Sequence, residues 1–354
     1  MRAPLSIALV VALATGPAFG QSSSADPAAG APLPPADQAE QAEQADQAEQ
    51  ALDISSRFFG PRQPVDEAFG AYQRGLYLTA LALALPRAEA DDAAAQTLIG
   101  ELYANGLGVA ESPARASSWY ALGDRNGDIR ATFSLAMLYQ QGVGVPQNRQ
   151  RAAELIAKAA AAGHLEATYN LALLYIEGRY VAPDLIRAAE LLRETAEAGL
   201  PEAQYDYSIM LLEGSGVAPD ADAGARYIGL AAAAGDVAAQ VEYATLIYLG
   251  RGARQNPGLA AAWYRTAAEA GNPVAQVRLA KLLAAGEGVS RDLVEAGMWR
   301  SLARRQGLID APLNEMLRRL TAEDTARAEE RARFWPNRPP LNTTSAPAAP
   351  AAPG

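Results

Sequence analysis

Apolar residues recur through the middle of the chain with two superimposed periods, one of a helical turn and one of 36 residues. In the stretch 128–141, apolar side chains are spaced so that all fall on one face of an α-helix: Ala131, Leu135, Leu138 and Tyr139. A second apolar set, Ala152, Leu155 and Ile156, follows after glycine-rich residues and predicts a second helix. The same pair of sets returns six times between residues 92 and 307, which predicts a stacked array of helical repeats.

Small and polar residues keep the same 36-residue step and mark the ends of the predicted helices. One glycine column closes each copy: Gly127, Gly163, Gly199, Gly235, Gly271 and Gly307. Another follows each first helix: Gly106, Gly142, Gly178, Gly214, Gly250 and Gly286. A third column precedes each second helix with residues that favour N-caps: Ser112, Asn148, Asp184, Asp220, Asn256 and Asp292. Glycine is the usual left-handed residue at a helix C-terminus, so each copy is predicted to be a helix–loop–helix unit.

The pattern of each copy resembles Sel1-like repeats. In the first copy it reads Ala95-Gln96 through Gly108-Val109, then Ala116, Trp119-Tyr120 and Gly127. The resemblance implies an all-α fold, a right-handed αα-solenoid of six 36-residue repeats over 92–307, with degenerate helical caps at both ends. It also implies an interaction scaffold rather than an enzyme.

The first 20 residues have the pattern of a secretory signal peptide. Arg2 supplies the positive start, an apolar run extends over 5–13, and Ala18-Phe19-Gly20 provides a small-x-small cleavage site. The alternative is an uncleaved N-terminal anchor. We expect the mature chain to be exported to the periplasm of a Gram-negative bacterium, without stable membrane insertion after cleavage.

The remaining segments flank the repeats. Residues 21–52 are low in complexity, rich in Ala, Gln and Glu, and predict a disordered linker. Residues 53–91 predict N-terminal capping helices, in which Asp91 stands where later copies have glycine. Residues 308–335 predict C-terminal capping helices, first over 308–320 and then over 321–335, and 336–354 a disordered Pro/Ala-rich tail.

Composition narrows the chemistry. The formal net charge of −10 argues against nucleic acid as the main partner. With no cysteine and a single histidine, His164, zinc and copper sites of usual composition cannot form, and we predict no cofactor. His164 begins a first helix, where a solvent-facing loop residue is the simplest interpretation. The aromatic residues at Trp119, Tyr120, Trp263, Tyr264 and Trp299 occupy core columns, which favours packing over a ligand platform.

The candidate binding surface lies on the first helices, at columns whose character varies between copies. By analogy with related solenoids, these columns line a groove. The residues predicted to form it are Asn170, Leu173, Glu177, Asp206, Ile209, Glu213 and Glu242. Their mixture of apolar and acidic side chains favours a protein or peptide partner with basic and apolar segments. The alternative is that Met137, Leu173 and Ile209 pack between neighbouring first helices.

We therefore predict a non-catalytic interaction scaffold or adaptor in the bacterial cell envelope. The resemblance allows roles in envelope signalling, secretion or exopolysaccharide control. The alternative is a peptidoglycan- or glycan-binding protein or a β-lactam-related envelope enzyme, although the sequence has no nucleophile elbow and no Walker-type loop. A purely structural spacer is a third interpretation.

Overall fold

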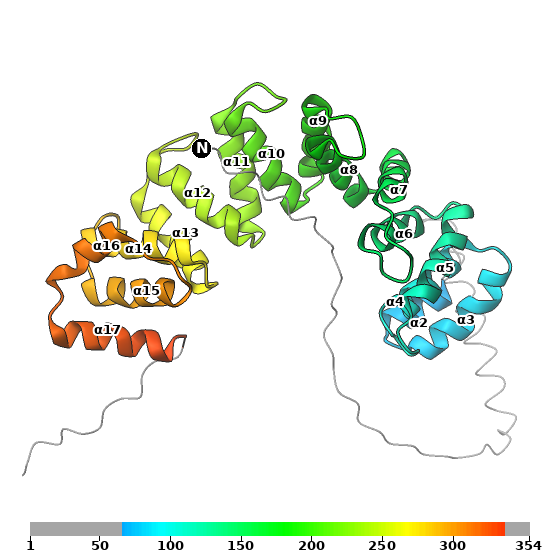
Figure 1. Cartoon of the computed structure of the whole chain (residues 1–354), viewed down its shortest axis with the longest axis horizontal. Helices are drawn as coiled ribbons and strands as arrows, with labels where there is room; N and C mark the ends of the chain where they lie inside the picture. The colour runs from blue at the N-terminus through cyan, green and yellow to red at the C-terminus, as the bar shows by residue number, and fades with distance from the viewer. Residues whose placement is uncertain (1–65, 337–354) are drawn as a thin grey trace, which may run out of the picture. The chain divides into compact units, whose positions relative to one another are not determined.

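The computed structural model describes residues 66–336, which are built from α-helices and one short 3₁₀ helix, without strands (Figure 1). In chain order the elements are α2 (Glu67–Gln73), α3 (Tyr77–Glu89), α4 (Ala93–Ala104), α5 (Pro113–Arg125), α6 (Ile129–Gln141), α7 (Arg149–Ala161), α8 (Leu165–Glu177), α9 (Leu185–Glu197), α10 (Pro201–Glu213), α11 (Ala221–Ala233), α12 (Val237–Leu249), α13 (Pro257–Glu269), α14 (Pro273–Ala285), α15 (Leu293–Arg305), α16 (Ala311–Met316), η1 (Leu317–Arg319) and α17 (Ala322–Phe334). The predicted all-α repeat array is confirmed. The expected signal peptide, linker and tail, with the start of the N-terminal cap, lie outside the described residues.

The described chain forms two compact units that divide between residues 159 and 160. In the first unit, α3 packs against α2 and α4, and α5 packs against α4 and α6. In the second unit, consecutive helices from α8 to α15 pack in series, α16 contacts α14, and α17 covers α15. Each unit therefore buries its apolar stripes between sequential helices, as a linear repeat array requires.

The caps predicted from the 36-residue columns are present. The side chain of each second-helix N-cap accepts a hydrogen bond from a main-chain N–H three residues later, for example Asp220 from Ala223 at 2.9 Å. First helices from α6 to α14 end at a left-handed glycine, such as Gly142 with φ 74°. Asp91 adopts φ 63° where the later copies have glycine, which supports the prediction that α3 is the second helix of a degenerate repeat.

A glutamine in the first turn of several first helices fastens each copy to the one before it. The Gln240 side chain donates to the carbonyl of Ala232, eight residues earlier, at 3.3 Å. Equivalent bonds join Gln96 to Ala88, Gln204 to Ala196 and Gln276 to Ala268. These amides are buried, and each adds a second hydrogen bond to a carbonyl at the C-terminal end of the preceding helix, which also accepts from the main-chain N–H three residues later.

The second glycine of the Gly-x-Gly loop is a contact between repeats. Gly144, at φ 71°, lies against the main chain of Pro113, the first residue of the preceding second helix α5, so that an added Cβ would collide with it. The same relation holds for Gly216 with Leu185, Gly252 with Ala221 and Gly288 with Pro257. Glycine is needed there for two reasons, the left-handed backbone and the space a side chain would take. The third copy has Tyr180 instead.

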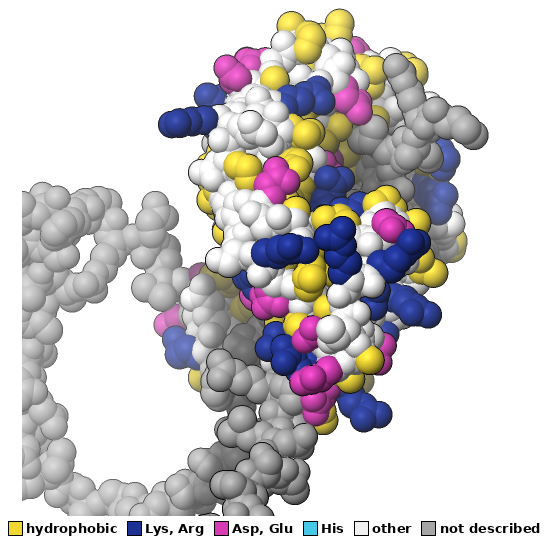
Figure 2. Space-filling view, turned by 90° about the vertical axis from the view of Figure 1, so that its left-hand side faces the viewer, with side chains coloured by type: hydrophobic (Ala, Val, Ile, Leu, Met, Phe, Trp, Pro, Cys, Tyr) yellow, Lys and Arg dark blue, Asp and Glu magenta, His cyan; other side chains and the backbone are white. Residues whose placement is uncertain are grey.

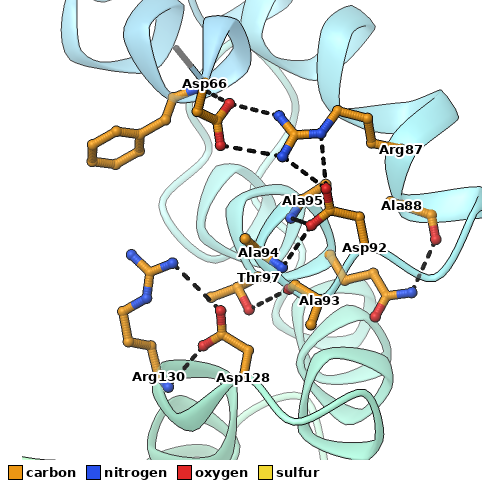
Figure 3. A network of polar contacts seen from close by, with 12 residues as sticks. Asp66, Arg87, Ala88, Asp92, Ala93, Ala94, Ala95, Thr97, Asp128 and Arg130 are labelled. Atoms are coloured by element: carbon orange, nitrogen blue, oxygen red, sulfur yellow. Dashed lines mark hydrogen bonds and ion pairs between the residues drawn. The ribbon is translucent and has the colours of Figure 1, made fainter. Parts of the chain in front are cut away.

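An arginine holds the N-terminal cap together (Figure 3). Arg87 on α3 donates to Asp66 at 2.6 Å and to Asp92 at 2.9 Å, and these aspartates are the N-caps of α2 and α4. The hydrogen bond from Arg87 lowers the pKa of Asp66. Burial acts to raise the pKa of Asp92, but the main-chain bond from Ala95 and the bond from Arg87 outweigh it, so that pKa is lowered too. One guanidinium thus couples three helices.

The C-terminal cap departs from the predicted helix over 308–320. α16 covers only six residues, Ala311–Met316, and one 3₁₀ turn follows. Asp310 caps α16 by accepting from Leu313, which starts the helix later than predicted. Leu320 is extended, at ψ 133°, because the chain must turn there into α17. The predicted final helix is confirmed as α17, and Trp335 after it packs edge-on against the buried Trp299.

Two left-handed glycines of the first unit, one in open space and one in a tight contact, allow the steric and the conformational need for glycine to be measured separately. Gly75 has φ 76° and no atom near its absent Cβ, whereas Gly144 at φ 71° faces the main chain of Pro113. Gly75→Ala should cost about 1 kcal/mol, the cost of a left-handed alanine. Gly144→Ala should cost about 2 kcal/mol more, because the collision adds to that cost. Urea unfolding of both variants measures the difference; equal losses would show that the loop contact is unimportant.

Candidate functional site

The predicted groove residues fall on three first helices of the second unit, α8, α10 and α12. Glu177, Glu213 and Glu242 are exposed, and Ile209 and Asp206 are partly exposed. Leu173 and Asn170 are each only 1% exposed, and Met137 in the first unit is 9% exposed. The alternative of packing therefore describes Leu173 and Met137, while Ile209 keeps an accessible surface. The part of the predicted set at the surface is mainly acidic.

Asp206 is the most perturbed carboxylate in the second unit. Tyr169 on α8 donates its hydroxyl proton to Asp206 Oδ2 on α10 at 2.8 Å, a hydrogen bond between consecutive repeats. Burial raises the pKa of Asp206 to about 6; the bond from Tyr169 opposes this rise, and the charges of Asp236 and Glu202 add to it. The pKa of Tyr169 is raised, first by burial and then by the Asp206 charge. Asp206 is held in place by a neutral donor.

We define the acidic cluster as Glu202, Asp206, Asp236 and Glu242. Asp236 is the N-cap of α12 and accepts from the main-chain N–H of Ala239. Burial is the largest cause that raises the pKa of Tyr205, and the charges of Glu242, Asp206 and Asp236 raise it further. Sequence reasoning found Asp206 and Glu242 but missed Glu202, Asp236 and Tyr169. Asp236 stands at a helix N-cap position, and Tyr169 stands one position before the varying column that contains Asn170, so the sequence pattern marks neither as a site residue.

The surroundings of the cluster are rich in acceptors and poor in donors. Two buried oxygens of this region, Asn170 Oδ1 and Glu202 Oε2, have no hydrogen-bond partner among the described residues. Asn170 uses its amide nitrogen on the carbonyl of Glu166 at 2.7 Å, one turn earlier in α8. Glu177 and Glu213 end their helices, where the helix dipole is also negative. The exposed carboxylates of Glu177, Glu213 and Glu242 suit the N–H groups of a cationic partner.

Other predicted features are explained by packing. His164 is the N-cap of α8 and accepts from Ala167 at 3.3 Å; its side chain is only 15% exposed, so the expected solvent-facing loop position is wrong. The imidazole supplies the acceptor that caps α8. Tyr120, Tyr264 and Trp299 are buried, as predicted for core columns.

Within residues 66–336, no group of three His, Cys, Asp or Glu side chains could hold a metal ion.

The end of the second unit has a different charge pattern. On the side where α15, α16 and α17 lie, Lys and Arg side chains are intermixed with Asp and Glu and with apolar atoms (Figure 2). Several of these charges pair within one helix, as Arg327 does with Asp324. In the described part of the chain, none of the helices has the length and hydrophobicity needed to cross a membrane.

The comparisons with known proteins agree with this architecture. The model of the Sel1 repeat matches six times, at 93–126, 129–164, 165–200, 201–236, 237–272 and 273–308. No curated protein matches the sequence.

Two solved structures are similar. A protective antigen of uropathogenic Escherichia coli with an SLR fold has a TM-score of 0.64 at 23% identity, over 83% of this chain and 64% of that one. This chain thus spans less than two thirds of that protein. A Sel1 repeat protein from Oxalobacter formigenes has a TM-score of 0.60 at 26% identity, over 68% of this chain and 98% of that one. Because the six family matches occupy more than half of the sequence, the chain belongs to the Sel1 repeat family.

Proposed function

We propose that this chain is a protein-interaction scaffold of the bacterial cell envelope, and that the acidic cluster with Ile209 receives a basic and apolar segment of a partner. Sel1 repeat proteins are generally interaction scaffolds. The observation that carries the finer proposal is the group of carboxylates on α10 and α12, of which Glu242 is exposed and Asp206 partly exposed, next to the partly exposed Ile209. Lysine or arginine side chains of a partner would pair with these carboxylates.

The periplasmic location is part of the proposal. Its support is the signal-like pattern of residues 1–20, which lie outside the described residues. A partner in that compartment would meet the repeats directly, so a role in envelope signalling, secretion or exopolysaccharide control is consistent with the location.

The energetics of Asp206 support a binding role. A carboxyl whose pKa is higher in the folded than in the unfolded state holds its proton more tightly when folded. Its contribution therefore favours folding at low pH and is lost as pH rises from 3.8 to about 6. Above that range the ionised Asp206 destabilises the fold. Residues that cost stability in this way are characteristic of functional sites.

Site-specific crosslinking tests the proposed surface. A photo-reactive residue at Ile209, in the exported protein in its native cells, should capture one protein. Asp206→Asn with Glu242→Lys should reduce that capture about tenfold, because several charge-assisted contacts are lost. The matched control is Glu194→Lys with Glu197→Gln on α9, which makes the same change in charge at exposed second-helix positions. Equal loss in the control, or capture of only this chain's own residues, would refute the proposal.

Asp206→Asn alone gives an independent thermodynamic test. Asparagine can still accept from the Tyr169 hydroxyl, but it carries no buried charge. The variant should be more stable than the parent at pH 7.5 by about 1 kcal/mol, after allowance for solvent screening at a partly exposed site.

The dependence of stability on pH should also change. Between pH 4 and pH 6 the variant should lack the parent's loss of stability with rising pH, because the titrating group is absent. Urea unfolding at four pH values measures both effects. A variant that is less stable than the parent at pH 7.5 would show that the charge is stabilising and would remove this support.

A further inference from the structure

A second surface feature of the second unit lies on α14. A pocket of about 390 Å³ opens between α12, α13, α14 and the start of α16, within the size range of ligand pockets in proteins, about 300–1,000 Å³. Its walls are formed by aromatic and aliphatic side chains with two cations and one carboxylate: Tyr248, Tyr264, Val277, Leu308, Arg278, Lys281 and Asp310. An apolar wall with a few convergent polar groups is the usual composition of a binding pocket.

Arg278 is the charged group of the pocket that lacks an acidic partner. Its guanidinium lies 5.9 Å from the centroid of the Tyr264 ring, and its Nη1 is 3.5 Å from the Tyr264 hydroxyl. No carboxylate of the described residues lies within salt-bridge distance of Arg278. Lys281, by contrast, pairs with Asp310 at 2.7 Å, so its charge is already compensated.

The tyrosine that positions Arg278 is itself fixed. Tyr264 is 2% exposed, and its hydroxyl lies 2.9 Å from Thr245 Oγ1. Thr245 donates its only hydroxyl proton to the carbonyl of Val241 at 2.8 Å, so Tyr264 must be the donor to Thr245. The Tyr264 oxygen then presents a lone pair toward Arg278. The guanidinium is therefore held at the pocket by a buried network, with donors left for a ligand.

The charge of the first helices reverses at this pocket. α8, α10 and α12 together carry six carboxylates and no lysine or arginine: Glu166, Glu177, Glu202, Asp206, Glu213 and Glu242. α14 carries Arg278 and Lys281 and no carboxylate. Arg278 stands 36 residues after Glu242 and 72 after Asp206, at the same position of the repeat. A cationic group, which suits the acidic cluster, would therefore be repelled by Arg278 at this pocket.

We propose that the pocket binds a peptide segment of a partner protein in which an aspartate or glutamate lies beside a large apolar side chain. The carboxylate pairs with Arg278, and the apolar side chain contacts Tyr248, Val277 and Leu308. Charge complementarity selects this occupant, because Lys281 and Asp310 pair with each other and the one uncompensated charge of the pocket is a guanidinium. The inference rests on the proposed interaction function and adds a second docking point with the opposite preference.

The probes are two capped hexapeptides, Gly-Ser-Glu-Phe-Gly-Ser and its Gln-Phe counterpart, with 3-phenylpropionate and 3-phenylpropionamide as small-molecule probes. Binding to the full chain is followed by ligand-observed NMR. The Glu-Phe peptide should bind saturably and at least about fivefold more tightly than the Gln-Phe peptide. Equal binding of the two peptides would overturn the proposal. If 3-phenylpropionate binds and the Glu-Phe peptide does not, the pocket would be assigned to small carboxylic acids instead.

Three variants assign the effect to residues. Arg278→Gln should weaken binding of the Glu-Phe peptide about fivefold or more. Asp310→Asn should strengthen it about twofold, because it releases Lys281, and asparagine still caps α16. Arg226→Gln is the matched control: Arg226 lies 5.2 Å from the Tyr227 ring centroid on α11, away from the pocket, and its replacement should change nothing.

Two outcomes with the variants contradict the proposal. Unchanged binding by Arg278→Gln, with an unfolding midpoint equal to that of the parent, would remove the guanidinium from the site. Weaker binding by Asp310→Asn would show that a carboxylate in the pocket wall favours the ligand, which is incompatible with an anionic ligand group. These measurements use no cellular partner, so their failure is distinguishable from a failure of capture at Ile209.

Discussion

The repeats depend on one close contact, in which the loop of each of four copies meets the main chain of the copy before it. Gly144, Gly216, Gly252 and Gly288 each lie against the first residue of the preceding second helix, without room for a Cβ. Contact between backbones fixes the spacing of the repeats independently of the side chains around them. Together with the buried glutamine bonds, it leaves the outward columns of the first helices free to vary in charge.

The fold was predictable because its determinants recur: capping residues, glycines and apolar stripes repeat at a fixed step, and even Asp91 could be identified as a glycine substitute. The site was less predictable. A helical period identifies one buried face, but a helix inside a repeat array is covered on further sides, so Leu173 could not be distinguished from Ile209. The pKa of Asp206 is raised by burial, which depends on the packing of neighbouring copies, and its hydroxyl donor Tyr169 belongs to the preceding copy and has no pattern of its own.

Asp206 and Arg278, at the two proposed docking points, differ in how the free protein holds their charges. Asp206 is ionised at neutral pH in spite of its burial, with one hydroxyl donor and two carboxylates nearby. Arg278 lies 5.9 Å from the ring centroid of Tyr264, whose hydroxyl a buried hydrogen bond holds in place, so part of its surroundings is ordered before binding. The first site is electrostatically costly in the free protein, whereas the second is prearranged. A ligand relieves the cost at one and uses the order at the other.

Asp206 and Arg278 occupy the same position of the repeat, and this restricts the orientation of a partner segment that contacts both. Repeat symmetry places Asp206, Glu242 and Arg278 at equivalent points of successive first helices, so the charge changes sign along a single column of the second unit. A column of uniform charge would accept an extended segment in either direction with similar energy. A column that is negative over α10 and α12 and positive at α14 favours only a segment whose basic part precedes or follows its acidic part in the matching order. In the reverse orientation, like charges would face each other at both ends of the segment and repel. The change of sign would therefore exclude the wrong orientation as well as favour the right one.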